Sequence, residues 1–418
     1  MKSGPTRLED LAPASPTRRT ALAWLAGASA SVQALVSVAA HGTPASWQRI
    51  LDQARGQTVY FHAWGGAATV NSYIQWAGEQ VRQRFGVTVV HVKIQDAADV
   101  VKQVRNQKRS NPRRGGVDLV WINGANFLTM KREGLLFGPF AEELPSYAYV
   151  DTQGQPTTRL DFSEPVDGME APWGMAQLTF MADAKRVSQP PQNLAAWLAF
   201  AAAHPGRTSY PRPPDFHGTT FLKQLLLDLT PESDRHAFYK EVTVDALTRL
   251  TRPLWNTLDG LHPHLWRQGR QFPSSAAAQR QMMSDGELLL AMTFNPNEVP
   301  NEIAAQRLSK STISFQFKGG TIGNTHFLAI PITAQAKAAA QVLTNFLLSP
   351  EAQGRKADID VWGDPTVLDV RRLSAADQAF FKSKPHPGQL QARAPALPEP
   401  HGSWVNPIQE EWSRRYGA

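Results

Sequence analysis

Cysteine is absent from this 418-residue chain. Its absence excludes disulfide bonds, thiolate catalysis, cysteine-ligated zinc, iron–sulfur clusters and lipid attachment at an N-terminal cysteine. Beyond the first 40 residues, no stretch approaches the ~18 consecutive apolar residues of a membrane-spanning helix. The net charge of +7 is spread out, without a dense basic patch interleaved with aromatics. Nucleic acid is therefore not expected as a partner.

The common signatures of enzymes are also missing. The sequence contains no Gly-x-Ser-x-Gly elbow, His-Glu-x-x-His motif, phosphate-binding Walker loop or Gly-x-Gly-x-x-Gly loop. His262-Pro263-His264 is the closest histidine pair, but it lacks a third ligand nearby. The aspartates at 358, 360 and 364 follow a spacing too common to indicate a site. We therefore expect no catalytic set, no metal and no cofactor.

The N-terminus has the layout of an export signal. Arg18-Arg19 precedes an alanine-rich, mildly apolar run, and Ser37, Ala39 and Ala40 offer small residues for cleavage. These features predict a twin-arginine export signal at residues 1–40, cleaved near residue 40, and a periplasmic protein. The alternative is a retained membrane anchor, although the run contains little Leu, Ile or Phe for a stable span.

Hydrophobic periodicity predicts an α/β fold. β-type runs at 58–63, 87–94 and 117–122 alternate with helical patterns at 67–85 and 96–107, an order that builds a parallel sheet. Residues 151–171 are read as a long connection. The alternation then continues, with strands at 177–182, 208–210, 287–294, 311–317 and 325–330 and helices at 194–203, 219–229, 276–284, 331–348 and 406–415.

Several of these strand ends are followed by segments rich in Gly, Asn, Thr and aromatic residues. Ligands of open α/β sheets bind at the carboxyl ends of strands, where helix N-termini present free N–H groups. Each segment alone is equally typical of an ordinary turn, but together they indicate a binding site. The candidate residues are Trp64, Gly65, Gly66, Asn123, Gly124, Asn126, Trp173, Tyr210, Asp215, Phe216, Asn295, Asn297, Glu298, Asn324 and Thr325.

Longer segments resemble a known family. "VDLVWINGANF" (117–127), "ELLLAMTFNPNE" (287–298), "GNTHFLAIP" (323–331) and "AAQVLTNFLLSPEAQ" (339–353) are similar to bacterial ABC-transporter solute-binding proteins. "FHAWGG", "YPRPPDFHGTTFLKQ" and "PEPHGSW" are most similar to the YnjB-type group, which is related to thiamine-, polyamine- and iron-binding members. The resemblance covers roughly residues 57–418.

The resemblance implies a two-lobed Venus-flytrap fold in which each lobe is a mostly parallel sheet flanked by helices. Lobe one would comprise 45–172 and 328–418, and lobe two 173–327, with hinge crossings near 171–175 and 325–331. A solute would be trapped between the lobes and delivered to an ABC permease in the inner membrane. The protein is expected to be a monomer.

Each candidate residue has an expected role in that cleft. Trp64, Trp173 and Phe216 would form apolar walls, the three glycines would offer backbone donors, and the asparagines with Thr325 would hydrogen-bond the solute. Asp215 or Glu298 would pair with a cationic group, and Tyr210 is as compatible with the core as with the site. Trp121 is expected in the core, and His326 is expected to be a packed histidine.

The identity of the solute stays open at this point. The mixture of aromatics and amides favours a small organic solute, for example a thiamine-like compound, over a bare ion. The alternative is an oxyanion at helix N-termini. Polyamines and ferric iron are disfavoured by the few acidic residues and by the single candidate tyrosine. Two other functions are weighed: a thiaminase-like transferase, which would need the missing cysteine, and a ligand-sensing partner of a membrane receptor.

Overall fold

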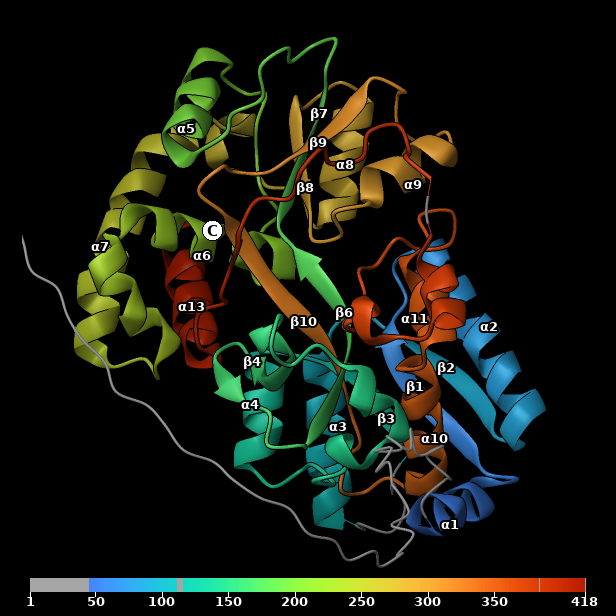
Figure 1. Cartoon of the computed structure of the whole chain (residues 1–418). Coiled ribbons are helices and arrows are strands. Elements are labelled where there is room, and N and C mark those ends of the chain that lie inside the picture. The colour runs from blue at the N-terminus through green and yellow to red at the C-terminus, as the bar shows by residue number, and fades with distance from the viewer. Residues whose placement is uncertain (1–44, 111–115, 383, 418) are drawn as a thin grey trace, which may run out of the picture. The chain divides into compact units, whose positions relative to one another are not determined.

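Two β-sheets organise the chain, which is described by a computed structural model for residues 45–110, 116–382 and 384–417 (Figure 1). The predicted export signal lies outside these described residues. Within them, no helix is long and apolar enough to cross a membrane.

The larger sheet is mixed, with strand order β11-β10-β3-β1-β2 and β6 also paired to β10. β1 runs parallel to β2 and β3, whereas β10 is antiparallel to β3 and β6. Its strands are β1 (Thr58–Trp64), β2 (Thr88–Ile94), β3 (Leu119–Ile122), β6 (Glu170–Gln177), β10 (Thr321–Ala329) and β11 (Ala396–Leu397).

The first half of this sheet confirms the predicted β-α-β-α-β order. Helix α2 (Ala68–Phe85) joins β1 to β2, and α3 (Ala97–Ser110) follows β2. α2 buries the apolar residues that recur at three- and four-residue spacing, and it ends at Gly86, whose φ of 68° is left-handed. The short-range pattern alone therefore determines this part of the fold.

The smaller sheet differs from the expectation. It has the order β8-β7-β9, and both outer strands are antiparallel to the central β7 (Thr179–Asp183). The two outer strands are β8 (Leu290–Thr293) and β9 (Thr312–Phe315). The expected mostly parallel sheet in the second lobe is thus wrong, because no β-α-β crossover joins neighbouring strands here.

β6 and β10 pair antiparallel and continue toward the smaller sheet, since β6 is followed by β7 and β10 is preceded by β9. Trp173-Gly174 and Gly323–His326 were expected in loops at strand ends, but they lie inside these two strands. Residues 208–210, expected as a strand, have no regular structure. The positions of the hinge and the lobe boundaries stay predictions.

The remaining helices surround the two sheets (Figure 1). A short antiparallel pair, β4 (Leu160–Asp161) and β5 (Glu164–Pro165), precedes β6. The helices are α1 (Ala45–Ala54), α4 (Ala125–Arg132), α5 (Leu194–Ala203), α6 (Phe216–Leu229), α7 (Val244–Leu261), α8 (Ala276–Ser284), α9 (Glu298–Ala304), α10 (Lys337–Leu347), α11 (Pro350–Ala357), α12 (Ala375–Gln378) and α13 (Val405–Tyr416).

The last helix, α13, packs away from the larger sheet. Trp404, Ile408 and Trp412 belong to the apolar core formed with α6, α7 and the strands of the smaller sheet. Trp412 Nε1 donates to the Tyr210 hydroxyl at 2.8 Å, and that hydroxyl lies 2.7 Å from His262 Nε2. The expectation had assigned the whole tail from residue 328 to lobe one, whereas its final helix contributes to the second core.

A buried ion pair joins α6 to the segment before α13. Lys223 Nζ lies 2.9 Å from Glu399 Oε2, and the two side chains are 1% and 2% exposed. The ammonium also lies 4.3 Å from the centre of the Phe162 ring, a cation–π contact. Asn324 Nδ2 donates to Glu399 Oε1 at 3.4 Å. These contacts tie α6, β10 and the β4–β5 pair together.

Candidate functional site

The corner at Trp64-Gly65-Gly66 ends β1 and leads into α2. A side chain at Gly66 would overlap the Trp64 indole, and one at Gly65 would begin 2.7 Å from Lys93 Cβ. The two glycines therefore make room for neighbouring side chains. Trp64 is 40% exposed, whereas the Gly65 N–H already donates to the Ile94 carbonyl at 3.2 Å. The corner thus presents an exposed indole, and its backbone donor at Gly65 is already used.

The corner at 123–126 is closed by packing around Gly124. This glycine has a φ of 62°, and a side chain there would begin 2.6 Å from the Phe162 ring. Its N–H donates to Asp161 Oδ2 at 2.7 Å. The expected free donor is therefore occupied, while Asn123 and Asn126 on either side are partly buried.

Asp215 begins α6 as its N-cap residue. Its Oδ1 accepts hydrogen bonds from the N–H groups of His217 at 2.8 Å and Gly218 at 3.1 Å. The next residue, Phe216, is partly buried and lies edge-to-face against Phe294 with 5.1 Å between ring centres. The helix was expected to begin at residue 219, but it begins at Phe216, and the Asp215 carboxylate contacts its first turn.

The candidate amides after β8 bind backbone carbonyls of another segment. Asn295 Nδ2 donates to the Trp362 carbonyl at 3.3 Å, and Asn297 Nδ2 to the Gly363 carbonyl at 2.6 Å. Glu298 forms an ion pair with Arg280 and accepts a hydrogen bond from the Thr293 hydroxyl. These side chains hold the turn after α11 against the start of α9.

Four other candidates are buried. Trp173 and Tyr210 have no exposed surface, and Asn324 and Thr325 are 3% and 1% exposed. Trp173 packs at 5.1–6.4 Å between ring centres against surrounding aromatics. Thr325 donates to the Thr157 hydroxyl at 3.1 Å. Their positions inside β6 and β10, or in the second core for Tyr210, explain this burial.

Sequence reasoning missed a polar cluster beside β10. His326 Nε2 lies 3.0 Å from Asp364 Oδ1, and Lys356 pairs with the other oxygen of this carboxylate. The His326 ring is edge-to-face with Trp121, with 5.0 Å between centres. Asp364 sits 38 residues away in sequence, so no local pattern could have linked the two. The only available signal was a histidine within a strand expected near the hinge.

Two buried carboxyl groups lie near the start of β6. Burial raises the pKa of Glu170 well above its usual value, and neither of its oxygens has a hydrogen-bond partner among the described residues. Burial likewise raises the pKa of Asp161, although the hydrogen bond from Gly124 opposes this shift. The folded protein therefore holds these carboxyl groups in their protonated forms over a wider pH range than water would.

Replacing Glu170 with glutamine should stabilise the protein at neutral pH. Because the folded-state pKa of Glu170 is raised, its contribution is most favourable below the usual value of 4.5 and is lost as the pH rises toward the folded-state pKa. The variant should thus melt several degrees above the wild type at pH 7, and the difference should vanish near pH 4. Equal melting temperatures at pH 7 would contradict a raised pKa.

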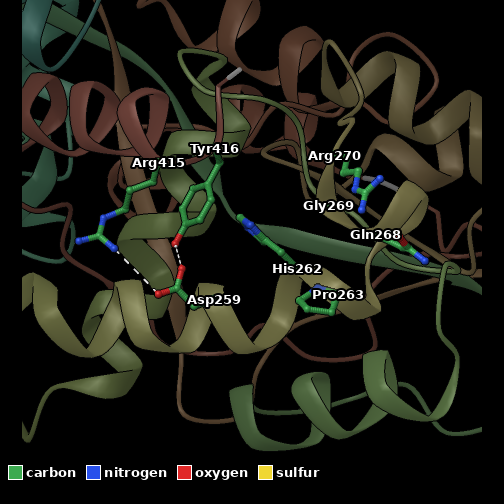
Figure 2. A pocket seen from close by; sticks show the side chains of 8 residues that line it. All are labelled: Asp259, His262, Pro263, Gln268, Gly269, Arg270, Arg415 and Tyr416. Carbon is green, nitrogen blue, oxygen red and sulfur yellow. Dashed lines mark hydrogen bonds and ion pairs between the residues drawn. The ribbon is translucent and has the colours of Figure 1, made fainter.

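The surface hollow shown in Figure 2 lies elsewhere and contains none of the candidate residues. It encloses about 490 Å³ between the end of α7, the following 3-10 turns and the end of α13. The Tyr416 hydroxyl donates to Asp259 at 2.6 Å, which fastens α13 to α7 (Figure 2). His262 is buried, and no cluster of three or more metal-binding side chains exists among the described residues.

Comparison with known proteins identifies the class. The family of bacterial extracellular solute-binding proteins matches residues 76–387, and the chain belongs to it. The chain is 46% identical over 396 residues to Protein YnjB of Escherichia coli strain K12, covering 94% of this chain and 98% of that protein. The resemblance to bacterial solute-binding proteins, and to the YnjB-type group among them, is therefore confirmed.

Solved structures share the fold at low sequence identity. The periplasmic binding protein AfuA from Actinobacillus pleuropneumoniae, with fructose-6-phosphate bound, has a TM-score of 0.59 at 12% identity, covering 86% of this chain and 99% of that one. A putative spermidine/putrescine ABC transporter protein from Listeria monocytogenes has a TM-score of 0.57 at 14% identity, covering 86% and 98%. These likenesses confirm the two-lobed α/β fold.

Proposed function

We propose that this protein is the solute-binding component of an ABC import system. The family match over residues 76–387 is the observation that carries this function. The antiparallel pair β6–β10 supports it, because two strands linking two sheets allow hinge closure around a solute. We place the crossings near 171–175 and 325–331, between lobe one (45–172 and 328–418, without the final helix α13) and lobe two (173–327), whose core α13 joins.

The proposed site lies between the two sheets and takes a small organic solute. Exposed Trp64 and partly buried Asn123, Asn126 and Phe216 are retained as contacts. Glu298 is already neutralised by Arg280, so Asp215 is the remaining candidate carboxylate for a cationic group. We keep both a thiamine-like cation and an oxyanion as candidate solutes for the binding test described below.

The other parts of the proposal concern location and partners. We propose periplasmic export with cleavage near residue 40, a monomeric protein, and delivery of the solute to a permease. A binding role without catalysis is preferred over a thiaminase-like transferase, because that chemistry uses a cysteine nucleophile and the chain has none. A sensing role would use the same closure.

Thermal unfolding of the purified mature protein against a solute panel tests this function. A solute at about 100 times its Kd adds roughly 2.7 kcal/mol to the free energy of unfolding, which raises the melting temperature by several degrees. The panel comprises vitamins including thiamine, amines, amino acids, sugars, sugar phosphates and oxyanions. If no member raises the melting temperature, the proposed function is wrong.

Replacing Trp64 with alanine should weaken binding of the stabilising panel compound while leaving the fold intact. Trp64 is 40% exposed, so its replacement removes less buried area than that of a fully buried tryptophan. Loss of a stacking wall should raise the Kd by roughly tenfold or more. Calorimetric titration measures the Kd, and circular dichroism checks the fold. Unchanged affinity would remove Trp64 from the site.

A further inference from the structure

The cluster around Asp364 fixes which ring nitrogen of His326 faces the carboxylate. Lys356 and Asp364 form an ion pair in which neither side chain is more than 2% exposed. Lys356 and His326 each contact a different oxygen of the Asp364 carboxylate. An ionised carboxylate only accepts hydrogen bonds, so Nε2 of His326 carries the proton that is donated to Asp364.

The opposite ring nitrogen of His326 is then a hydrogen-bond acceptor. With the proton on Nε2, Nδ1 carries a lone pair. The hydrogen bonds found among residues 45–110, 116–382 and 384–417 include none to Nδ1, and the His326 side chain keeps 13% of its surface exposed. The partly buried Trp121 indole lies edge-to-face beside the same ring. An acceptor therefore sits next to an apolar surface.

Other residues fix this arrangement in place. The amide of Asn301 donates to the Ile359 carbonyl, and together with those of Asn295 and Asn297 it anchors the turn that carries Asp364. Gly174 faces the cluster across the strand pair, where a side chain would overlap Asp364 Oδ2 and begin 2.7 Å from His326 Cδ2. The absence of a side chain at Gly174 thus leaves room for the cluster.

We propose that His326 Nδ1 and the Trp121 indole form a subsite for an organic solute that donates a hydrogen bond from a hydroxyl or amino group beside an apolar surface. This inference rests on the proposed function and names the chemistry of its solute. Asp364 acts as a positioning residue that fixes the histidine tautomer. Asn295 and Asn297, which were expected to bind the solute through their amides, help to position the turn instead.

The test uses two histidine variants that separate the roles of the ring nitrogens. Glutamine at 326 places its amide near Nε2, so His326→Gln keeps a donor for Asp364 and loses the acceptor at Nδ1. Asparagine places its amide near Nδ1, so His326→Asn keeps an acceptor and loses the bond to Asp364. The probes are fructose 6-phosphate, γ-aminobutyrate, putrescine and thiamine, which carry O–H or N–H donors, with acetate and nitrate as probes without a donor at neutral pH.

We expect at least one donor-bearing probe to bind the wild type and its Kd to rise by about tenfold in His326→Gln, the effect of one lost hydrogen bond. The melting temperature of that variant without a probe should stay near the wild-type value, and His326→Asn should bind more tightly than His326→Gln. An unchanged Kd in His326→Gln, or equal stabilisation of the wild type by acetate or nitrate, overturns the subsite and leaves the proposed function standing. A wild type stabilised by none of the six probes contradicts the donor-bearing solute class; the broader panel then decides the proposed function separately.

Discussion

Replacing Lys223 with alanine should lower the free energy of unfolding by about 3–5 kcal/mol, because it leaves the buried Glu399 carboxylate without its partner. The two side chains are 1% and 2% exposed, so water does not replace the lost ammonium. The change also removes the cation from the face of Phe162. Urea unfolding at pH 7, monitored by circular dichroism, measures the loss.

A surface pair provides the matched control for this prediction. Lys102 Nζ lies 3.0 Å from Asp99 Oδ1, and the two side chains are 67% and 79% exposed. Lys102→Ala should change the free energy of unfolding by no more than about 0.5 kcal/mol. Replacing Lys223 and Glu399 together with methionine should recover much of the loss, since no unpaired charge remains. If Lys223→Ala lowered the free energy of unfolding as little as Lys102→Ala does, water would have to reach the Glu399 carboxylate.

The second large effect is expected at Trp173. Its side chain has no exposed surface and touches the rings of Phe61, Tyr73, Trp121 and Trp362. Trp173→Ala opens a cavity in the larger core and should reduce the free energy of unfolding by about 3–5 kcal/mol. Thermal and urea unfolding of the purified variant measure this loss.

Trp64→Ala is the matched comparison for Trp173→Ala. Both tryptophans were expected to form walls of the solute site, yet Trp64 is 40% exposed and Trp173 is fully buried. The Trp64 variant should lose less than the Trp173 variant, because part of the Trp64 side chain already contacts water in the folded protein. If Trp64→Ala is the more destabilising of the two, the assignment of Trp64 to a surface site is wrong.

The sequence was sufficient where local patterns determine the structure. The β1-α2-β2-α3-β3 order follows from the spacing of apolar residues, which alternates between a two-residue and a 3.6-residue period. In β1, α2 and α3 these apolar residues are the buried ones. β6 was missed because Pro172 and Gly174 interrupt its pattern. Pairing with β10 over most of its length makes this segment a strand, which shows tertiary context overriding local propensity.

The sequence indicated which polar residues need hydrogen-bond partners, but it did not indicate which groups those partners are. Asn295 and Asn297 were expected to hydrogen-bond the solute, but their amides donate to backbone carbonyls that lie 67 and 66 residues further along the chain. The His326–Asp364 pair was missed for the same reason, because the two residues lie 38 positions apart in the sequence. Local sequence shows which groups need partners, whereas the fold decides which carbonyl or carboxylate supplies them.

The exposed corner at Trp64 also has an optical consequence. Among the tryptophans that the structure describes, Trp64 is the one exposed beyond a third of its surface. A dissolved quencher such as acrylamide should therefore reach this indole first, while the buried tryptophans keep their emission. The difference between wild-type and Trp64→Phe emission then isolates one residue at the mouth of the proposed cleft. Lobe closure over a solute becomes visible in unlabelled protein as a fall in that quenching.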